Sequence, residues 1–299
     1  MTDLLELLVS AAASGCIYGL VALAYLVILK PTGIINFAVG EWVTTGAFLS
    51  VVMLTAGSWG TLELPQIVAL AAIIVVMGGV GWAVEVLTVR PLVERGAQIL
   101  SPILALLGVL VIFREGVVLI FGPDNFSVPP PFGFARLEIG PFAGAPQHFT
   151  IIAATLVLFA LVWYFAERTL WGKGFQAVAL NRRAAALMGI NLGFVTALAF
   201  AGGAAVAGIA GLLVSPLTSA HYLMGLPLAI QGFSALVIGG VGRVEGALLG
   251  GFILALVEQL AARYLPIPSG LTLGAPLLLM ILFLLVRPTG ILRPHEASA

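Results

Sequence analysis

Long, nearly unbroken apolar stretches constrain the fold of this chain more than any other feature. The run at 277–286, for example, contains no charged residue and no alternation of polar and apolar residues. A helix that crosses a bilayer needs about 20 mostly apolar residues. In lipid, strands are stable only in closed barrels, whose strands alternate in polarity. The pattern therefore predicts membrane-spanning helices.

The composition excludes most soluble classes of protein. The chain has 299 residues, of which 61% are hydrophobic and 9% are charged, whereas soluble domains are about 25% charged. These few polar residues cannot cover the surface of a soluble enzyme, a nucleic-acid binder or a disordered chain. The formal net charge is zero, so no field attracts a polyanion. With one cysteine, Cys16, and three separated histidines, we expect no disulfide, no metal site and no cofactor.

Eight long stretches and a shorter ninth have roughly the length of a membrane span. We expect an all-α, polytopic transmembrane helix bundle of 8–9 spans, forming a single domain over 1–299. Proline lacks an N–H and disfavours a helical predecessor, so we expect Lys30–Gly33 to end the first span and Arg90–Pro91 the third. The stretches are 4–29, 36–57, 65–88, 101–121, 149–166, 192–215, 246–263 and 271–286, with 226–241 as the short one.

The distribution of basic residues predicts the orientation, because basic loops are retained on the cytoplasmic side. With nine crossings and the N-terminus outside, ten of the thirteen basic residues fall inside, and the C-terminus is cytoplasmic. The proline-rich loop 122–148 is then external, and the basic loop 167–191 is cytoplasmic. The ten residues are Lys30, Arg90, Arg95, Arg168, Lys173, Arg182, Arg183, Arg243, Arg287 and Arg293.

The basic loop 167–191 favours a short helix. Its alanines and leucines predict a helix over about 175–188, and Gly189 would end it. Such a helix, rich in small residues, suits a groove on a partner protein. An amphipathic linker lying on lipid headgroups, with Arg182 and Arg183 touching phosphates, fits equally well.

Charged residues within the spans need a reason, because each costs roughly 2.5–3.5 kcal/mol at the bilayer centre. Arg114 and Glu115 are adjacent and point about 100° apart on a helix, so we expect each to have its own partner. They would contact a zwitterionic solute or form interhelical pairs. Asn36 and Glu41 follow a Pro/Gly break, where they would orient a solute or cap the next helix.

Other polar and small residues in the spans have simpler interpretations. We expect Glu258, five residues before Arg263, to reach the interface by snorkelling. Gly240 and Gly242 permit tight turns and close backbone approach. They would suit a broken helix that lines a pathway, with helix packing as the alternative. With Asn36, Glu41, Arg114 and Glu115 they make up the candidate translocation pathway.

Four motifs in order carry a resemblance to a known family. The chain resembles the permease subunits of branched-chain amino acid ABC importers, specifically the shorter of the two permease types, over nearly its whole length. The motifs are Tyr18-Gly19-Leu20-Val21-Ala22-Leu23 with Thr32-Gly33-Ile34-Ile35-Asn36-Phe37-Ala38-Val39-Gly40-Glu41; Ala184-Ala185 with Leu187-Met188-Gly189-Ile190-Asn191; Gly239-Gly240-Val241-Gly242 with Gly246-Ala247 and Gly250-Gly251; and Arg287-Pro288-Thr289-Gly290.

This resemblance implies a set of partners and a docking segment. The partners are a second permease subunit, in a hetero- or homodimer, two cytoplasmic ATPase subunits, and a periplasmic or extracellular solute-binding protein. No nucleic acid is involved, and the lipid bilayer is the surroundings. The implied ATPase-docking residues are Gly174, Phe175, Ala179, Asn181, Arg182, Ala184, Ala185, Leu187, Gly189 and Ile190.

The chain is expected to be a transport subunit rather than an enzyme. It has no phosphate-cradling Gly-x-x-x-x-Gly-Lys-Ser/Thr motif, so an ATP-driven motor must be another chain. The resemblance implies import of branched-chain amino acids or related small solutes across the bacterial inner membrane by alternating access. Permeases for urea, short amides or sugars of the same superfamily remain alternatives. An ion-gradient-driven secondary transporter is the rival from another class.

Overall fold

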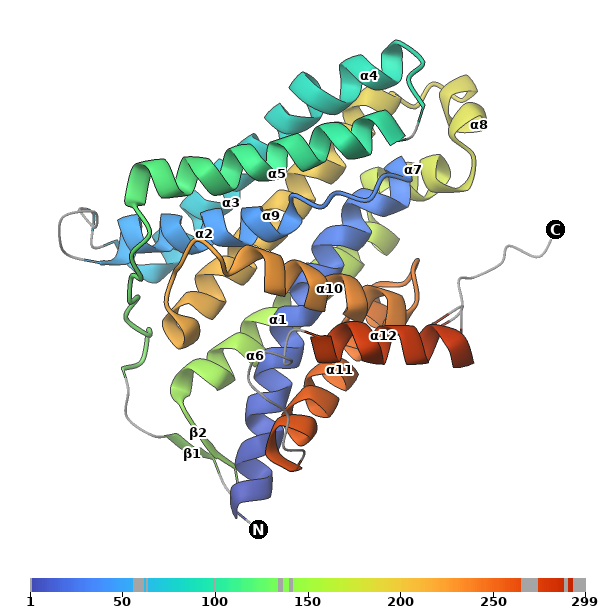
Figure 1. Ribbon diagram of the computed structural model, residues 1–299. Helices are drawn as coiled ribbons and strands as arrows, with labels where there is room; N and C mark the ends of the chain where they lie inside the picture. Colours follow the sequence, from blue (N-terminus) through green and yellow to red (C-terminus); the bar gives the residue numbers. More distant parts are fainter. Residues whose placement is uncertain are drawn as a thin grey trace.

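Helices make up most of the computed structural model, which describes residues 2–55, 62, 64–98, 100–133, 137–139, 142–264, 274–287 and 290–292. Figure 1 shows them as a bundle in which the N-terminus and the strands lie at one end. The first half contains α1 (Thr2–Thr32), α2 (Val39–Leu54), α3 (Gln66–Val84), the π-helix η1 (Glu85–Val89), α4 (Arg90–Glu94), α5 (Leu100–Phe121), β1 (Leu137–Ile139) and β2 (Phe142–Gly144). The second half contains α6 (Pro146–Arg168), α7 (Leu170–Leu180), α8 (Arg182–Leu187), α9 (Leu192–Thr218), α10 (Gly225–Gly239), α11 (Val244–Tyr264) and α12 (Gly274–Val286).

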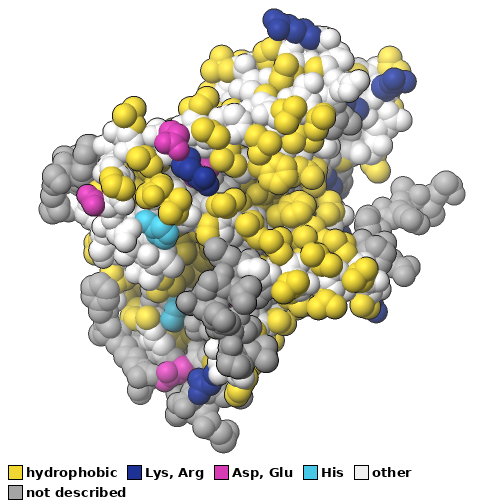
Figure 2. Space-filling view, in the orientation of Figure 1, with side chains coloured by type: hydrophobic (Ala, Val, Ile, Leu, Met, Phe, Trp, Pro, Cys, Tyr) yellow, Lys and Arg dark blue, Asp and Glu magenta, His cyan; other side chains and the backbone are white. Residues whose placement is uncertain are grey.

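Every predicted apolar stretch contains a helix at the expected place, which confirms the helical membrane bundle. Within the described residues, six helices are long and apolar enough to cross a membrane, namely α1, α3 with its extension, α5, α6, α9 and α11. The helices α2, α10 and α12 are apolar but shorter. Residues 271–273 of the last predicted span lie outside the described residues. Apolar side chains are spread over much of the described face in Figure 2, and charged side chains are few there, as expected for a surface in contact with lipid.

The centre of the bundle is formed by α1 and α9. In their most apolar windows 72% and 78% of the residues are buried, compared with 17% in α5 and in α6. Small residues allow this packing, because a Cβ at Gly203 would clash with Ile28 of α1 and a Cβ at Gly208 would clash with Met77 of α3. The helices α2 and α3 pack mainly against α9, whereas α10 and α11 pack against α1 and against each other, and α10 also contacts α2.

The short helix α2 begins about midway along the bundle. The first helix ends at Thr32, and Gly33 adopts a φ of 70°, as predicted for the Pro/Gly break. An extended segment then leads back to α2, and it is visible between α1 and α2 in Figure 1. The hydroxyls of Ser50 and Ser215 lie 3.0 Å apart, and Gly46 packs on Gly208. The two helices therefore run parallel, with Val39 level with the middle of α9.

The start of α10 lies beside the start of α2. A Cβ at Gly40 would clash with the backbone of Gly225, so no side chain separates the two helices there. At its other end α10 turns into α11 through Gly240 and Gly242, whose φ angles are 102° and 128°. Gly290, of the closing motif, packs directly on Gly240. Two motifs that are distant in the sequence thus form one tight junction.

The third span is longer than predicted. Pro91 does not end it, because the helix widens into the π-turn η1 and continues as α4 to Glu94. Pro91 occupies the first turn of α4, where its missing N–H is tolerated. The widened turn thus carries the chain past the proline, which corrects the expectation that Arg90–Pro91 ends the span.

The proline-rich loop is partly structured at the end of the bundle that carries the N-terminus. The strands β1 and β2 form an antiparallel hairpin in which Leu137 pairs with Gly144, and we call this end the hairpin end. Phe126 and Ala220 exchange two backbone hydrogen bonds of 2.9 and 2.8 Å, which tie the loop to the turn after α9. Because α6 begins at Pro146, the last residues of the predicted loop 122–148 are helical. The segment α7–α8 lies at the opposite end (Figure 1).

Candidate functional site

A charged pair lies at the start of α2. Arg114 of α5 donates two hydrogen bonds to Oε1 of Glu41, 3.1 Å from Nε and 2.8 Å from Nη2. Only 1% of the Glu41 side chain is exposed, compared with 24% of the Arg114 side chain. The pair therefore bridges α2 and α5 near mid-depth, and its basic member reaches the surface of the chain. Arg114 finds its partner on another span, as the sequence predicts.

Several buried polar atoms of residues at the start of α2 lack a hydrogen-bond partner among the described residues. They are Oε2 of Glu41, Nδ2 of Asn36 and Nε1 of Trp42. Asn36 does not cap α2 directly, because its Oδ1 accepts from the N–H of Ala38, two residues later and one before the helix. Buried polar groups in native structures are normally paired. The start of α2 therefore offers donors and an acceptor to a water molecule or a polar solute.

Two helix N-termini overlap at this point, because α2 and α10 start side by side and run in opposite directions. Unpaired N–H groups and the helix dipole make such an end favourable for negative charge. This field stabilises the buried Glu41 carboxylate, and it would also favour the carboxylate of a bound solute.

The other predicted pathway residues lie elsewhere. Glu115 is exposed on α5 among apolar side chains such as Ile112 and Leu119, and so it points away from the Glu41–Arg114 pair. Gly240 and Gly242 join α10 to α11, roughly 15 Å along α10 from Ala229, which packs on Gly40. The structure therefore brings together Asn36, Glu41 and Arg114, and it separates Glu115 and the two glycines from them.

Sequence reasoning missed a second polar cluster in the hairpin half of the bundle. Glu258 of α11 accepts a 2.8 Å hydrogen bond from the hydroxyl of Tyr18 and a 3.1 Å bond from Nε2 of Gln231. It is held between helices and does not snorkel beside Arg263, contrary to expectation. Tyr18 and Gln231 also line a cavity of about 270 Å³ with His221. Each of three spans contributes one polar side chain to this cluster, and nothing in the sequence pairs them.

A third cluster ties the π-turn to α9. The buried Glu85 accepts from Nη2 of Arg90 at 2.9 Å and from the Thr196 hydroxyl at 2.7 Å, and Arg90 also donates to the carbonyl of Gly193. These bonds fix α4 to the start of α9. Among the described residues, no three His, Cys, Asp or Glu side chains come together in a way that could hold a metal ion.

The loop 167–191 forms two helices, where the sequence predicted one over 175–188. Asn181 adopts an extended conformation that ends α7, and its Oδ1 accepts from the N–H of Ala184 to cap α8. Thr169 caps α7 and Asn191 caps α9 in the same way. In each case the side-chain oxygen accepts a hydrogen bond from the backbone N–H three residues later, which is the usual way a Thr or Asn caps the start of a helix. The chain therefore makes two sharp turns within this short segment.

Gly189 ends α8, as predicted. Its φ is 84°, its N–H donates to Ala186, and the N–H of Ile190 donates to Ala185. This pattern is a Schellman motif, in which a left-handed glycine closes the helix.

The predicted docking residues divide into an inward and an outward group. Val178, Ala185 and Val195 are buried in a small core, with Phe175 and Ile190 packed against it. This core fastens α7 and α8 to α9. The remaining members, which are partly or fully exposed, are Gly174, Ala179, Asn181, Arg182, Ala184, Leu187 and Gly189.

Large apolar side chains are exposed on this segment. Leu187 is 89% exposed at the end of α8. We define the docking patch as Leu170, Trp171, Leu180, Leu187 and Met188, all of which are exposed. A groove of about 730 Å³ runs between Leu170 and Trp171 on one side and Gly189 and Ile190 on the other. An exposed apolar patch beside a groove is typical of a protein-binding surface.

Comparisons with known proteins find the same class of protein over nearly the whole length of this chain. A family model described as "Branched-chain amino acid transport system / permease component" matches residues 7–285. The high-affinity branched-chain amino acid transport system permease protein BraD of Pseudomonas aeruginosa is 31% identical, covering 98% of this chain and 97% of its own. The corresponding LivH protein of Escherichia coli strain K12 is 28% identical, with the same shares covered.

A sugar permease is also similar, over a smaller part of the chain. The ribose import permease protein RbsC of Haemophilus influenzae is 26% identical over 72% of this chain and 67% of its own. The family model and BraD, by contrast, cover nearly all of the apolar helices described above. This chain therefore belongs to the family of branched-chain amino acid transport system permease components, and it is a multi-pass protein of the bacterial inner membrane.

Proposed function

We propose that this chain is one permease subunit of an ATP-driven importer that carries branched-chain amino acids or related small solutes into the cell. The observation that carries this proposal is the match of one permease family over residues 7–285. The names of BraD and LivH support the class of solute. The N-terminus and the hairpin end face outward, and α7–α8 with the C-terminus face the cytoplasm, as the basic residues indicate.

Two ATPase subunits supply the driving force, one of them seated on this chain. The docking patch and the groove beside it receive a helix or loop of the ATPase. Lys173 and Gln176 of α7 bond to Glu167 at the end of α6, at 3.3 and 3.0 Å. The small core around Val178 joins α7 and α8 to α9. A push on α7–α8 therefore reaches both a peripheral span, α6, and a central one, α9.

The solute is handed over at the hairpin end by a binding protein and passes beside the start of α2. A zwitterionic amino acid carries a carboxylate and an ammonium group. The overlapping N-termini of α2 and α10 and the Arg114 guanidinium favour the carboxylate. The unpaired Oε2 of Glu41 favours the ammonium group. Alternating access then moves this site between the two sides as the ATPases close and open.

A second permease subunit completes the pathway. Arg114 is partly exposed and Glu115 is exposed on the apolar surface of α5. A charged side chain facing lipid is costly. A neighbouring subunit that covers this part of α5 removes that cost and encloses the solute beside Arg114.

Reconstituted transport tests the proposal. The chain is placed in proteoliposomes with its second permease, its ATPases and its binding protein, and uptake of radiolabelled leucine is followed with and without ATP. We expect uptake only with ATP and with the full set of subunits. Competition by unlabelled valine, urea, acetamide and ribose then separates the classes of solute. Uptake by this chain alone, driven by a sodium or proton gradient, would contradict the proposal.

A further inference from the structure

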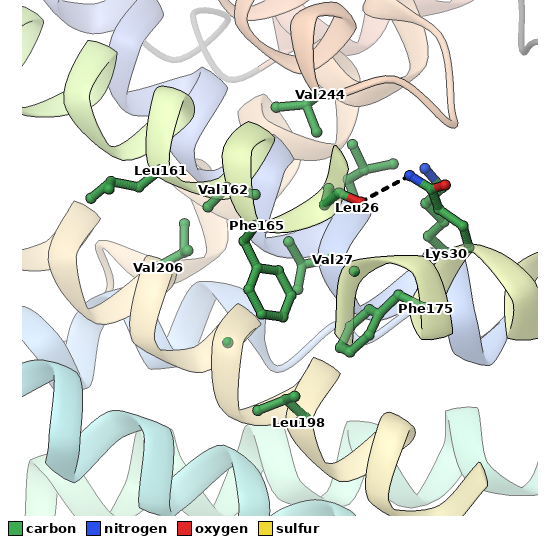
Figure 3. A pocket seen from close by; sticks show the side chains of 14 residues that line it. Leu26, Val27, Lys30, Leu161, Val162, Phe165, Phe175, Leu198, Val206 and Val244 are labelled. Carbon is green, nitrogen blue, oxygen red and sulfur yellow. Dashed lines mark hydrogen bonds between the residues drawn. The ribbon is translucent and has the colours of Figure 1, made fainter. Parts of the chain in front are cut away.

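An apolar cavity of about 320 Å³ lies between α1, α6, α7 and α9, with Val244 at the start of α11 also in its lining. Figure 3 shows its walls, which include Val27 from α1, Phe165 from α6 and Leu198 from α9, with Phe175 of α7 at its edge. Its volume is at the lower end of the roughly 300–1,000 Å³ that ligand sites occupy. The cavity is separate from the Glu41–Arg114 pair, from the Tyr18 cluster and from the groove beside the docking patch, none of which contributes a lining residue.

Small residues leave this space open. Gly202 lines the cavity from α9, and a Cβ there would lie 3.5 Å from Cγ1 of Val27, in ordinary contact. A larger side chain at this position would therefore project into the cavity. On the opposite side, Phe165 and Phe175 pack edge to face with centroids 5.8 Å apart. These two rings hold α7 against the end of α6 beside the cavity.

Two polar side chains line the cavity, Gln176 and Lys30, and Figure 3 shows Lys30 at its edge. Gln176 is engaged, because its Nε2 donates to the carbonyl of Ala166 at 3.0 Å and to Glu167 at 3.0 Å. Lys30 is half-buried, and among the described residues no ion pair includes it. An unpaired ammonium group thus sits at the mouth of an apolar space.

The depth of the cavity fits the headgroup boundary of one leaflet. Lys30 is two residues from the end of α1, and Glu167 and Arg168 end α6 at the same level, beside α7. A lysine at the end of a span extends its ammonium group to the interface. The cavity extends from this level into the bundle along Leu26, Leu161 and Val162, which belong in the hydrocarbon region.

We propose that this cavity binds an anionic phospholipid of the leaflet on the α7–α8 side, with one acyl chain inside and the phosphate against Lys30. The cavity matches such a lipid in two ways. The apolar walls accept only hydrocarbon, and Lys30, the one cation among the described residues that line the cavity, selects a negatively charged headgroup over a zwitterionic one. Because Phe175 and Gln176 belong to α7, the bound lipid would support the helix that carries part of the docking patch.

Lipid binding by the purified full chain tests the proposal. The chain is stripped of lipid in detergent, and phosphatidylglycerol, phosphatidylcholine with the same acyl chains, or inorganic phosphate is added. Retained lipid is counted by native mass spectrometry, and Tm is recorded. We expect a preference for phosphatidylglycerol of about fivefold, equivalent to the roughly 1 kcal/mol that one basic residue contributes at an anionic surface. Phosphate alone should leave Tm unchanged.

Two variants and two controls assign the effect to this cavity. Lys30→Gln should remove the preference for phosphatidylglycerol, and Gly202→Leu should reduce retention of both lipids. Lys173→Gln alters a lysine that is already paired at the same end of the bundle, and Gly79→Leu adds a side chain where nothing lies within 4 Å. Both controls should bind lipid as the parent chain does.

The opposite results would overturn the proposal. Equal retention of the two lipids by the parent chain, an unchanged preference in Lys30→Gln, or a Tm shift with phosphate alone would each contradict it. If Gly202→Leu fails to fold, the Lys30→Gln comparison decides. The assay measures no transport, so its outcome is independent of which solute the permease carries.

Discussion

The guanidinium of Arg114 decides whether the Glu41 carboxylate is tolerated near mid-depth. Glu41 is almost fully buried, whereas Arg114 retains some exposure. The two partners are therefore unequal, because a lone Glu41 stays enclosed by the chain, whereas a lone Arg114 can turn toward the surface of the chain. The sequence marks each residue as unusual for a span, but no spacing rule connects positions on two different helices that are 73 residues apart.

This inequality predicts different effects of removing each partner. Arg114→Gln leaves a buried carboxylate unpaired, which typically costs about 3–5 kcal/mol. Glu41→Gln leaves a guanidinium that can turn toward the surface, so the loss should be smaller. Thermal unfolding of the two single variants and of Glu41→Gln/Arg114→Gln in detergent measures this. We expect Arg114→Gln to have the lowest Tm and the double variant to recover most of the loss. Equal Tm values for the two single variants would contradict it.

At the scale of elements, close helix contacts depend on glycines that face backbone. A Cβ at Gly46 would clash with Gly208, and one at Gly211 would clash with the backbone of α2. The sequence shows many glycines but not which of them face a neighbouring helix. Gly78 and Gly79 of α3 are as apolar in context as Gly46, yet a Cβ there would meet open space or only a distant carbonyl.

The contact between α2 and α9 predicts a contrast between two glycines. Gly46→Leu forces α2 away from α9, and overpacking of this kind costs about 1–3 kcal/mol or more. Gly79→Leu adds a side chain to an open surface. Size-exclusion profiles and Tm values of the two purified variants compare them. Gly46→Leu should aggregate or melt earlier, while Gly79→Leu should behave like the parent chain. Similar losses in both would show that α2 and α9 do not pack as described.

The conformation of the α7–α8 segment could not be predicted from its sequence alone. Its apolar residues predict helix, but Asn181 divides the helix in two and turns Ala185 inward and Leu187 outward. The break at Asn181 therefore determines which of the predicted docking residues are exposed and can contact a partner protein. A charge at Ala185 would disturb the fold itself, because this residue is buried in the small core that joins α8 to α9.

Replacing the exposed side chain of Leu187 should weaken binding of the ATPase subunits. Leu187→Glu places a carboxylate on the docking patch without altering the inward core, and we expect co-purification of the ATPase subunits to fall at least about tenfold, equivalent to about 1.4 kcal/mol. Phe132→Glu, at an exposed apolar residue in the loop toward the hairpin end, is the control and should co-purify normally. Pull-down of the tagged permease measures both. Retention of the ATPases by Leu187→Glu would contradict the assignment.

At the scale of the whole molecule, hydrophobic length predicted each apolar helix because lipid leaves the backbone no other solution. The same rule could not predict that α2 begins near mid-depth beside α9, or that a π-turn carries the third span past Pro91. The specific pairings within the polar clusters around Glu41, Glu258 and Glu85 could not be predicted either, because each joins residues from separate spans.

The central claim is that an ATP-driven motor acts on this permease from the cytoplasmic face through α7–α8. The only cysteine of the chain, Cys16, is buried. A Cys16→Ala background with Leu187→Cys therefore places one reactive thiol on the docking patch. Labelling with a membrane-impermeant maleimide in right-side-out and inside-out vesicles is the most direct measurement. We predict labelling only in inside-out vesicles, with protection when ATPase subunits are bound. Labelling in right-side-out vesicles would place the docking patch outside the cell and contradict the account.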